Sequence, residues 1–191
     1  MGPSRCVDTV PAPAPELAKE KKDPLLTSRR QFSSGTLGLC NAMEFLGYKT
    51  YNMGQVIHNG YPHLKMFTEA LQIKRTGQGQ PYSRSDFDKW MWDYDVLTIV
   101  PCYLTEEIFK AYPDAKFILT VREPEAWAQS IWNTISLLSV RAQTFPSSFF
   151  KYFDAIDLQF SRLVGLIFET ISREHGRTEA GFRAAMEEYE E

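Results

Sequence analysis

The stretch that decides the fold of this chain is YPDAKFILTVREPEAWAQS, which runs from Tyr112 to Ser130. Residues 117–121 within it form a short run rich in strand-forming side chains, which is typical of a strand inside a parallel sheet. Pro124 suits the first position of a helix, where a missing N–H group costs nothing. The stretch therefore predicts a turn, a buried strand and a helix, with Arg122 at the junction between strand and helix.

Arg122 lies where open α/β sheets bind their ligands, at the carboxyl end of a strand. A guanidinium group beside the free N–H groups of a helix N-terminus suits a phosphate. The alternative is that Arg122 pairs with a nearby carboxylate, such as Glu123 or Glu125, and binds no ligand. The local pattern leaves both interpretations open.

A second landmark is the segment SSGTLGL, which starts at Ser33 and precedes a helical pattern over residues 39–46 that Gly47 closes. A turn of small residues leading into a helix exposes backbone N–H groups to an anion, and Thr36 adds a hydroxyl group. The alternative is a capped helix start that binds no ligand. The segment is not a Walker A motif, since no Gly-Lys-Ser/Thr sequence follows it.

Both segments resemble the nucleotide-binding segments of the sulfotransferase superfamily, in particular its P-loop-like branch, which is abundant in filamentous fungi. The family holds the 3′-phosphate of 3′-phosphoadenosine 5′-phosphosulfate (PAPS) with an arginine that ends the strand and a serine on the next helix. The matching positions here are Arg122 and Ser130. The loop that holds the 5′-phosphosulfate corresponds to Ser34, Gly35 and Thr36. The resemblance covers roughly residues 25–190 and implies that these five residues bind PAPS.

The chain departs from the family pattern at two positions near the chemistry. The family has a lysine or arginine in the loop, where this chain has Ser33, and Arg29 and Arg30 are the nearest basic residues before it. Relatives commonly carry an aspartate two residues before the proline that ends the next strand, and here Ile99 precedes Pro101 in that way. Two interpretations stay open: a sulfotransferase whose catalytic groups have moved, or a protein that kept the fold and does something else.

His63 is the candidate for a general base, which sulfuryl transfer to an alcohol or phenol needs close to the acceptor. It falls in a helical run over residues 61–71, near a family position that is often histidine. A histidine at the edge of the core is the alternative. The family's other common histidine position holds Asn52 here. Five aromatic residues are candidates for the acceptor pocket, with core packing as the alternative for most: Tyr51, Tyr61, Phe67, Trp90 and Tyr103.

The expected fold is a three-layer αβα domain of P-loop-like, sulfotransferase-like type with a mainly parallel sheet over residues 25–191. Residues 1–24 are expected to form a disordered tail, because a Pro-Ala repeat from Pro11 to Pro15 precedes a charged run. A chain of 191 residues, 43% of them hydrophobic, is long enough to bury one core. Family members usually continue past an acidic helix like that at residues 184–191, so the family's closing segment is expected to be missing.

The remaining patterns predict short strands and helices in alternation. Strands are expected over residues 25–27, 49–52 and 96–100. Helices are expected over residues 106–111, 147–173 and 177–190, and up to Trp92 after a cap at Ser83, Ser85 or Asp86.

The composition limits the classes of partner. A net charge of −3 with scattered basic residues argues against a nucleic-acid surface. The sequence shows no signal peptide and no apolar run near the ~18 residues of a membrane span, so the cytoplasm is the expected location. The cysteines Cys6, Cys40 and Cys102 are odd in number and widely spaced, which predicts neither a disulfide framework nor a zinc site.

The sequence therefore predicts a sulfotransferase-like protein that acts on a small hydroxylated metabolite, in fungal secondary metabolism, with PAPS as the sulfuryl donor and no metal. The alternatives are an enzyme of the same fold that catalyses a step other than sulfuryl transfer, and a non-catalytic accessory or binding protein.

Overall fold

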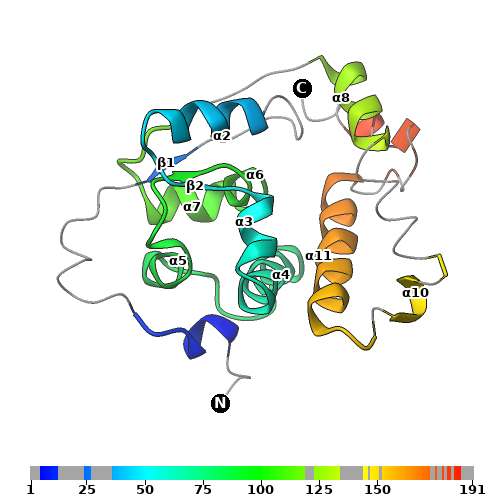
Figure 1. The fold of residues 1–191 in the computed structure, drawn as a ribbon, viewed down its shortest axis with the longest axis horizontal. Helices are drawn as coiled ribbons and strands as arrows, with labels where there is room; N and C mark the ends of the chain where they lie inside the picture. Colours follow the sequence, from blue (N-terminus) through cyan, green and yellow to red (C-terminus); the bar gives the residue numbers. More distant parts are fainter. Residues whose placement is uncertain are drawn as a thin grey trace. The chain divides into compact units, whose positions relative to one another are not determined.

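The computed structural model describes residues 5–12, 24–26, 36–118, 123–133, 144–145, 147–150, 152–172, 175, 178, 180–181 and 183–185. The chain divides into two compact units. Unit 1 comprises Met1–Arg29 and Gly35–Leu119, and unit 2 comprises Arg30–Ser34 and Thr120–Glu191. Each unit has its own elements (Figure 1) and is treated by itself below.

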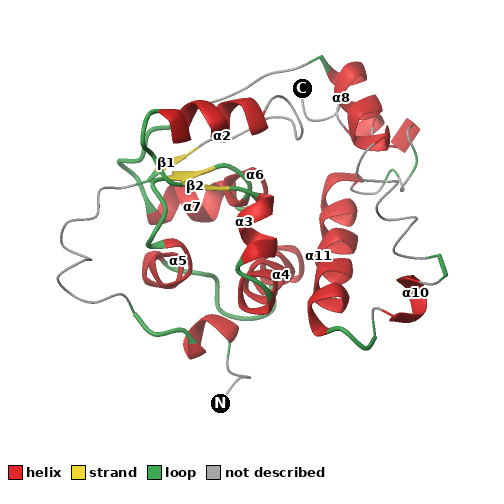
Figure 2. Ribbon diagram, viewed as in Figure 1, coloured by secondary structure: helices red, strands yellow, loops and turns green. Residues whose placement is uncertain are grey.

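Unit 1 contains a small parallel sheet of three described strands: β1 at Leu25–Leu26, β2 at Thr50–Tyr51 and β3 at Val96–Leu97. The strand order is β1-β3-β2, so both outer strands pair with β3. The central strand is fully buried, as expected of a parallel strand covered on both faces. The three strands confirm an α/β class with a parallel sheet, although helices make up most of the described residues (Figure 2).

Two helices of unit 1, α2 and α3, contact the strand β2. The helical elements in chain order are η1 at Cys6–Thr9, α2 at Thr36–Phe45, α3 at Met53–His58, α4 at Tyr61–Thr76, α5 at Arg84–Met91, α6 at Val100–Tyr103 and α7 at Thr105–Ala111.

The core of unit 1 is an aromatic cluster around Trp90 of α5. The Trp90 ring lies 5.7 Å from Phe67 of α4, 6.3 Å from Phe87 and 6.3 Å from Tyr51 of β2, measured between ring centroids. The pair with Phe67 is tilted, that with Tyr51 edge-on and that with Phe87 stacked, and aromatic pairs at such separations add about 0.5–1.5 kcal/mol each beyond their buried area. The cluster therefore ties α4 and α5 to the end of β2.

Local signals determine where several helices begin and end. Ser83 is the N-cap of α5, and its hydroxyl and the Asp86 carboxylate form a capping box. Gly77 ends α4 in the left-handed conformation, with φ of 66°. These termini confirm the predicted helix after Ser83 and extend the helix predicted over residues 61–71 to Thr76.

The strand predicted over residues 96–100 is wrong beyond Leu97, because α6 begins at Val100. Pro101 has no N–H group to give to a sheet, and it lies in the first turn of this helix, where that group is not needed. The predicted strand over residues 117–121 is described only as far as Ile118, with a single β-bridge at Phe117, and its remaining residues lie outside the described part.

Unit 2 contains α8 at Pro124–Ile131, α10 at Ser147–Phe150 and α11 at Ala155–Ser172. Pro124 opens α8, as predicted. The helix predicted over residues 147–173 is wrong as one continuous helix. Asp154 begins a new helix there, because its carboxylate accepts the N–H groups of Ile156 and Asp157.

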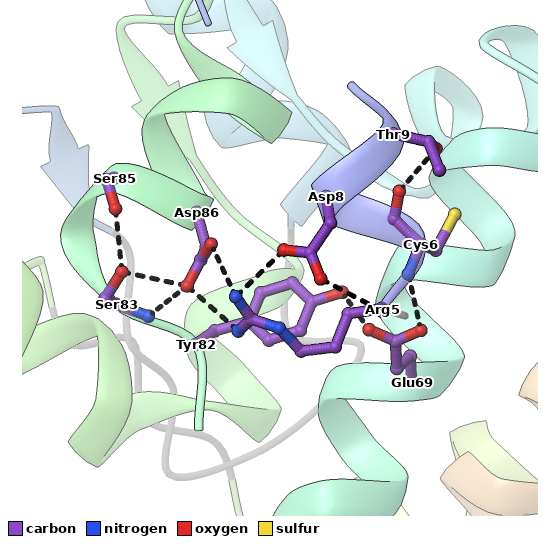
Figure 3. Close-up of polar contacts among 9 residues, drawn as sticks. All are labelled: Arg5, Cys6, Asp8, Thr9, Glu69, Tyr82, Ser83, Ser85 and Asp86. Atoms are coloured by element: carbon purple, nitrogen blue, oxygen red, sulfur yellow. Dashed lines mark hydrogen bonds and ion pairs between the residues drawn. The ribbon is translucent and has the colours of Figure 1, made fainter. Parts of the chain in front are cut away.

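The N-terminal residues differ from the disordered tail expected over residues 1–24. Arg5 bonds the carboxylates of Asp8 and Asp86, and the N–H group of Cys6 donates to Glu69 of α4 (Figure 3). Val7 is fully buried. Burial of Val7 and the paired charges therefore hold residues 5–10 on unit 1, which differs from the expected disorder of this segment. Residues 13–23 lie outside the described part, and the boundary at residue 25 stays a prediction.

Candidate functional site

The predicted nucleotide-binding residues fall in both units. Thr36 is the first residue of α2 in unit 1 and is half-buried. Ser130 is in the last turn of α8 in unit 2 and is also half-buried. Ser34, Gly35 and Arg122 lie outside the described residues. The set of five therefore stays a prediction as a binding site.

Hydrogen bonds attach α2 to the carboxyl edge of the sheet. The thiol of Cys40 donates to Thr98 Oγ1 at 3.7 Å, and the Thr98 hydroxyl donates to the carbonyl oxygen of Tyr51 at 3.0 Å. Tyr51 is the last residue of β2 and Thr98 directly follows β3. In open α/β folds this edge is where ligands bind. The two bonds therefore hold α2, which begins at Thr36, against that edge.

Trp127 of α8 carries a buried donor that finds no acceptor among the described residues. The side chain is 2% exposed, and its Nε1–H group has no hydrogen-bond partner. Residues three apart on a helix lie on neighbouring parts of its surface, which places Trp127 beside Ser130. An orphaned N–H group next to a hydroxyl suits a ligand rich in acceptor oxygens, such as a phosphate. The described part of α8 thus carries an unpaired buried donor close to the predicted phosphate ligand Ser130.

The alternative for Arg122 is an ion pair with a nearby carboxylate, Glu123 or Glu125. Glu125 pairs with Arg183 at 3.3 Å, at a position where both side chains are exposed. Glu123 is exposed at the start of α8. Glu125 therefore has a cationic partner within unit 2.

His63 lies in the first turn of α4, where its ring contacts the end of β2. Its Nδ1 atom is 2.7 Å from the hydroxyl oxygen of Tyr51, which also accepts the Nε1–H group of Trp90 at 2.9 Å. Burial lowers the pKa of His63 to about 4 and raises the pKa of Tyr51. The ring is therefore neutral at neutral pH.

The ring of Tyr51 also packs against a second tyrosine, Tyr94. The two ring centroids lie 4.7 Å apart, and the Tyr94 hydroxyl accepts a hydrogen bond from Asn59 at 2.8 Å. The sequence indicates His63 as a candidate base, but it predicts its partner Tyr51 only as pocket lining or core. Its position as the last residue of a strand at the ligand edge was the signal available.

The five aromatic candidates for the acceptor pocket divide between core and surface. Four are buried and one, Tyr61, is 40% exposed; the buried ones are Tyr51, Phe67, Trp90 and Tyr103. Core packing accounts for Tyr51, Phe67 and Trp90 through the cluster around Trp90.

Two positions that depart from the family pattern, Asn52 and Ile99, have structural roles, and a third, Ser33, lies outside the described residues. Asn52 caps α3, because its Oδ1 atom accepts the N–H group of Gln55 at 3.2 Å. Ile99 is 6% exposed and precedes α6, so an apolar side chain occupies the position where relatives commonly have an acid. Ile99 supplies no acidic group at that position.

Within the described ranges, no group of histidine, cysteine and acidic side chains is arranged to hold a metal ion. The described helices also include none that is both long and apolar enough to cross a membrane.

Comparison with known proteins identifies the family of this chain. A family model described as a sulfotransferase domain matches residues 32–191. A protein of Aspergillus versicolor named Ava biosynthesis cluster protein M is 38% identical over 118 residues, which make up 61% of this chain. The matched part spans 45% of that relative, which is less than half of its length. Because the family model covers most of the chain, from before α2 to the last residue, the protein belongs to the sulfotransferase domain family.

Proposed function

We propose that this protein transfers a sulfuryl group from PAPS to a hydroxyl group of a small metabolite. The observation that carries the proposal is the sulfotransferase domain match over residues 32–191. The name of the Aspergillus versicolor relative places that protein in a biosynthesis cluster, and we propose a similar role for this chain in fungal secondary metabolism. The proposal includes a cytoplasmic location and the three-layer αβα, P-loop-like arrangement.

In this proposal Arg122 and Ser130 bind the 3′-phosphate, and Ser34, Gly35 and Thr36 bind the 5′-phosphosulfate. When bound, PAPS supplies an activated sulfuryl group. The orphaned indole N–H group of Trp127 beside Ser130 supports the first assignment. The attachment of α2 to the carboxyl edge of the sheet through Cys40 supports the second.

His63 is the proposed general base, which removes the proton of the acceptor hydroxyl during transfer. A base must be uncharged before it acts, and the burial that lowers its pKa to about 4 keeps the ring in that state. A general base works best when its pKa is near the working pH, so this ring is a weak one. Slow turnover is the expected consequence.

Calorimetric titration with 3′-phosphoadenosine 5′-phosphate tests the nucleotide site. The wild-type protein should bind, and Arg122→Ala should lose roughly tenfold or more in affinity, because a hydrogen bond to a charged group contributes about 1.5–3 kcal/mol. Arg183→Ala is the matched control, since it removes the same charge from the same unit at an exposed residue. Its affinity should stay close to that of the wild type.

Sulfuryl transfer is then measured by the mass increase of hydroxylated acceptors incubated with PAPS and protein. Transfer that disappears in Arg122→Ala and His63→Gln would support the proposal. A folded protein that does not bind the nucleotide would reject it.

A further inference from the structure

The hydroxyl group of Tyr51 joins side chains from three elements of unit 1 by hydrogen bonds. Tyr51 ends β2, His63 is in α4 and Trp90 is in α5. The Trp90 indole nitrogen lies 2.9 Å from the Tyr51 oxygen, and His63 Nδ1 lies 2.7 Å from it. Among the described residues, these are the hydrogen-bond partners of this hydroxyl. Their donor and acceptor roles decide where the proton of His63 is.

Trp90 fixes the first of these roles. An indole nitrogen carries a hydrogen and only donates, so the Tyr51 oxygen accepts from Trp90. The hydroxyl keeps one hydrogen of its own, and Tyr51 is fully buried. A buried hydroxyl hydrogen needs an acceptor, and His63 Nδ1 is the one within reach.

Two arrangements of the His63 ring are possible in the neutral state. With the proton on Nε2, the bare Nδ1 atom accepts from Tyr51, and both hydrogens of the network are used. With the proton on Nδ1, the ring donates to Tyr51, which leaves the Tyr51 hydrogen buried without an acceptor among the described residues. The second arrangement is disfavoured because an unsatisfied buried donor is costly.

We infer that Tyr51, anchored by Trp90, is a positioning residue that holds His63 in the neutral form with its proton on Nε2. Aromatic contacts pack the elements that carry the three side chains. Phe67 of α4 lies 5.7 Å from the Trp90 ring of α5, and Tyr94 lies 4.7 Å from the Tyr51 ring, measured between centroids. The burial that keeps His63 neutral agrees with this assignment.

The consequence for catalysis rests on the proposed function. In the resting protein, Nε2 of His63 is a hydrogen-bond donor, suited to an oxygen of the acceptor or of the sulfuryl group. A base needs Nε2 without its proton, so His63 accepts a proton there only after the ring changes to the other tautomer. Tyr51 therefore opposes the base form of His63.

The test is the tautomer of His63, measured by two-bond ¹H–¹⁵N correlation spectra of the uniformly labelled protein at pH 7 without nucleotide. The sequence contains three histidines, so His63→Gln identifies the signals. We expect the wild type to show one neutral tautomer, with the proton on Nε2. In Tyr51→Phe the population with the proton on Nδ1 should rise roughly tenfold.

Tyr94→Phe is the matched control, because it removes a tyrosine hydroxyl from the same stack that bonds Asn59 and not His63. Its His63 spectrum should be unchanged. Near-UV circular dichroism checks that each variant is folded. If Tyr51→Phe does not fold, the wild-type tautomer decides the test, since protonation on Nδ1 contradicts the assignment.

A wild-type His63 that is protonated on Nδ1, or a tautomer that Tyr51→Phe does not change, would overturn the inference. Neither result involves PAPS or turnover. Failure of this inference is therefore distinguishable from failure of the proposed function, which the nucleotide titration decides.

Discussion

At the scale of single residues, His63 shows what the fold adds to a side chain. In isolation a histidine has a pKa of 6.5, and in this protein burial lowers it to about 4. Its neighbours Tyr51 and Trp90 add a directed hydrogen-bond chain rather than a charge. The result is a neutral ring whose proton position is decided by two buried aromatic side chains.

The lowered pKa of His63 predicts a pH dependence of stability. The unfolded chain takes up a proton near pH 6.5, whereas the folded protein resists it until about pH 4. Stability from this group is therefore complete above pH 6.5 and is lost as the pH falls towards 4. We expect a loss of roughly 1–2 kcal/mol across this window, after discounting for the partial exposure of the ring.

Urea unfolding of the wild type and His63→Gln between pH 7 and 4 measures this loss, which the variant should lack. His58→Gln, at an exposed histidine of α3, is the control and should behave as the wild type. Asp86 affects stability over a different pH range. Burial raises its pKa, but hydrogen bonds from Ser83 and Arg5 outweigh burial and lower the pKa. The stability that Asp86 contributes is therefore lost only below pH 3.8. Equal slopes for wild type and His63→Gln would contradict the prediction.

At the scale of elements, helix termini follow their local residues closely. Gly77 ends α4 with φ of 66°, and Ser83 begins α5 with a capping box. Gly38, by contrast, lies inside α2, where an added Cβ atom meets nothing within 4 Å. The same residue type is therefore required at one position and dispensable at the other.

These two glycines predict opposite effects of one substitution. Gly77→Ala should lower the free energy of unfolding by about 1–2 kcal/mol, because a side chain disfavours the left-handed conformation. Gly38→Ala should raise it by about 0.5–1 kcal/mol, because alanine loses less backbone freedom in a helix. Chemical denaturation of both variants gives the two values. Changes of the same sign would contradict either the left-handed conformation of Gly77 at the end of α4 or the helical conformation of Gly38 within α2.

At the scale of the whole molecule, contacts between distant parts of the chain hold the N-terminal residues on unit 1. Arg5 bonds Asp86 at 3.1 Å across 81 positions, and Cys6 bonds Glu69 at 2.8 Å across 63. Burial of Val7 adds apolar contact. Figure 3 shows these carboxylates converging on the N-terminal segment from α4 and α5.

This docking predicts that Val7 stabilises unit 1. Val7→Ala should reduce the free energy of unfolding by roughly 2 kcal/mol, because it leaves a cavity at a fully buried side chain. Val10→Ala is the control, since Val10 follows η1 and is partly exposed, and its effect should be much smaller. Thermal unfolding of the two variants decides the matter. Equal small shifts would mean that the segment does not dock on unit 1 in solution.

The sequence by itself determined the family, the parallel α/β class and several helix starts. Pro124 and Ser83 act through the N–H groups of the next few residues, so their effect is visible in a short window. The length of β3 was missed, because a strand and the first turn of a helix both accept the apolar run that ends at Val100.

Only the tertiary structure decided the surroundings of His63 and the place of the N-terminal segment. Tyr51, His63 and Trp90 come from a strand and two helices, and their hydrogen bonds depend on how these elements pack. Arg5 finds Asp86 for the same reason. Local rules of backbone geometry act between neighbours in the chain, whereas burial and hydrogen-bond direction act between neighbours in space.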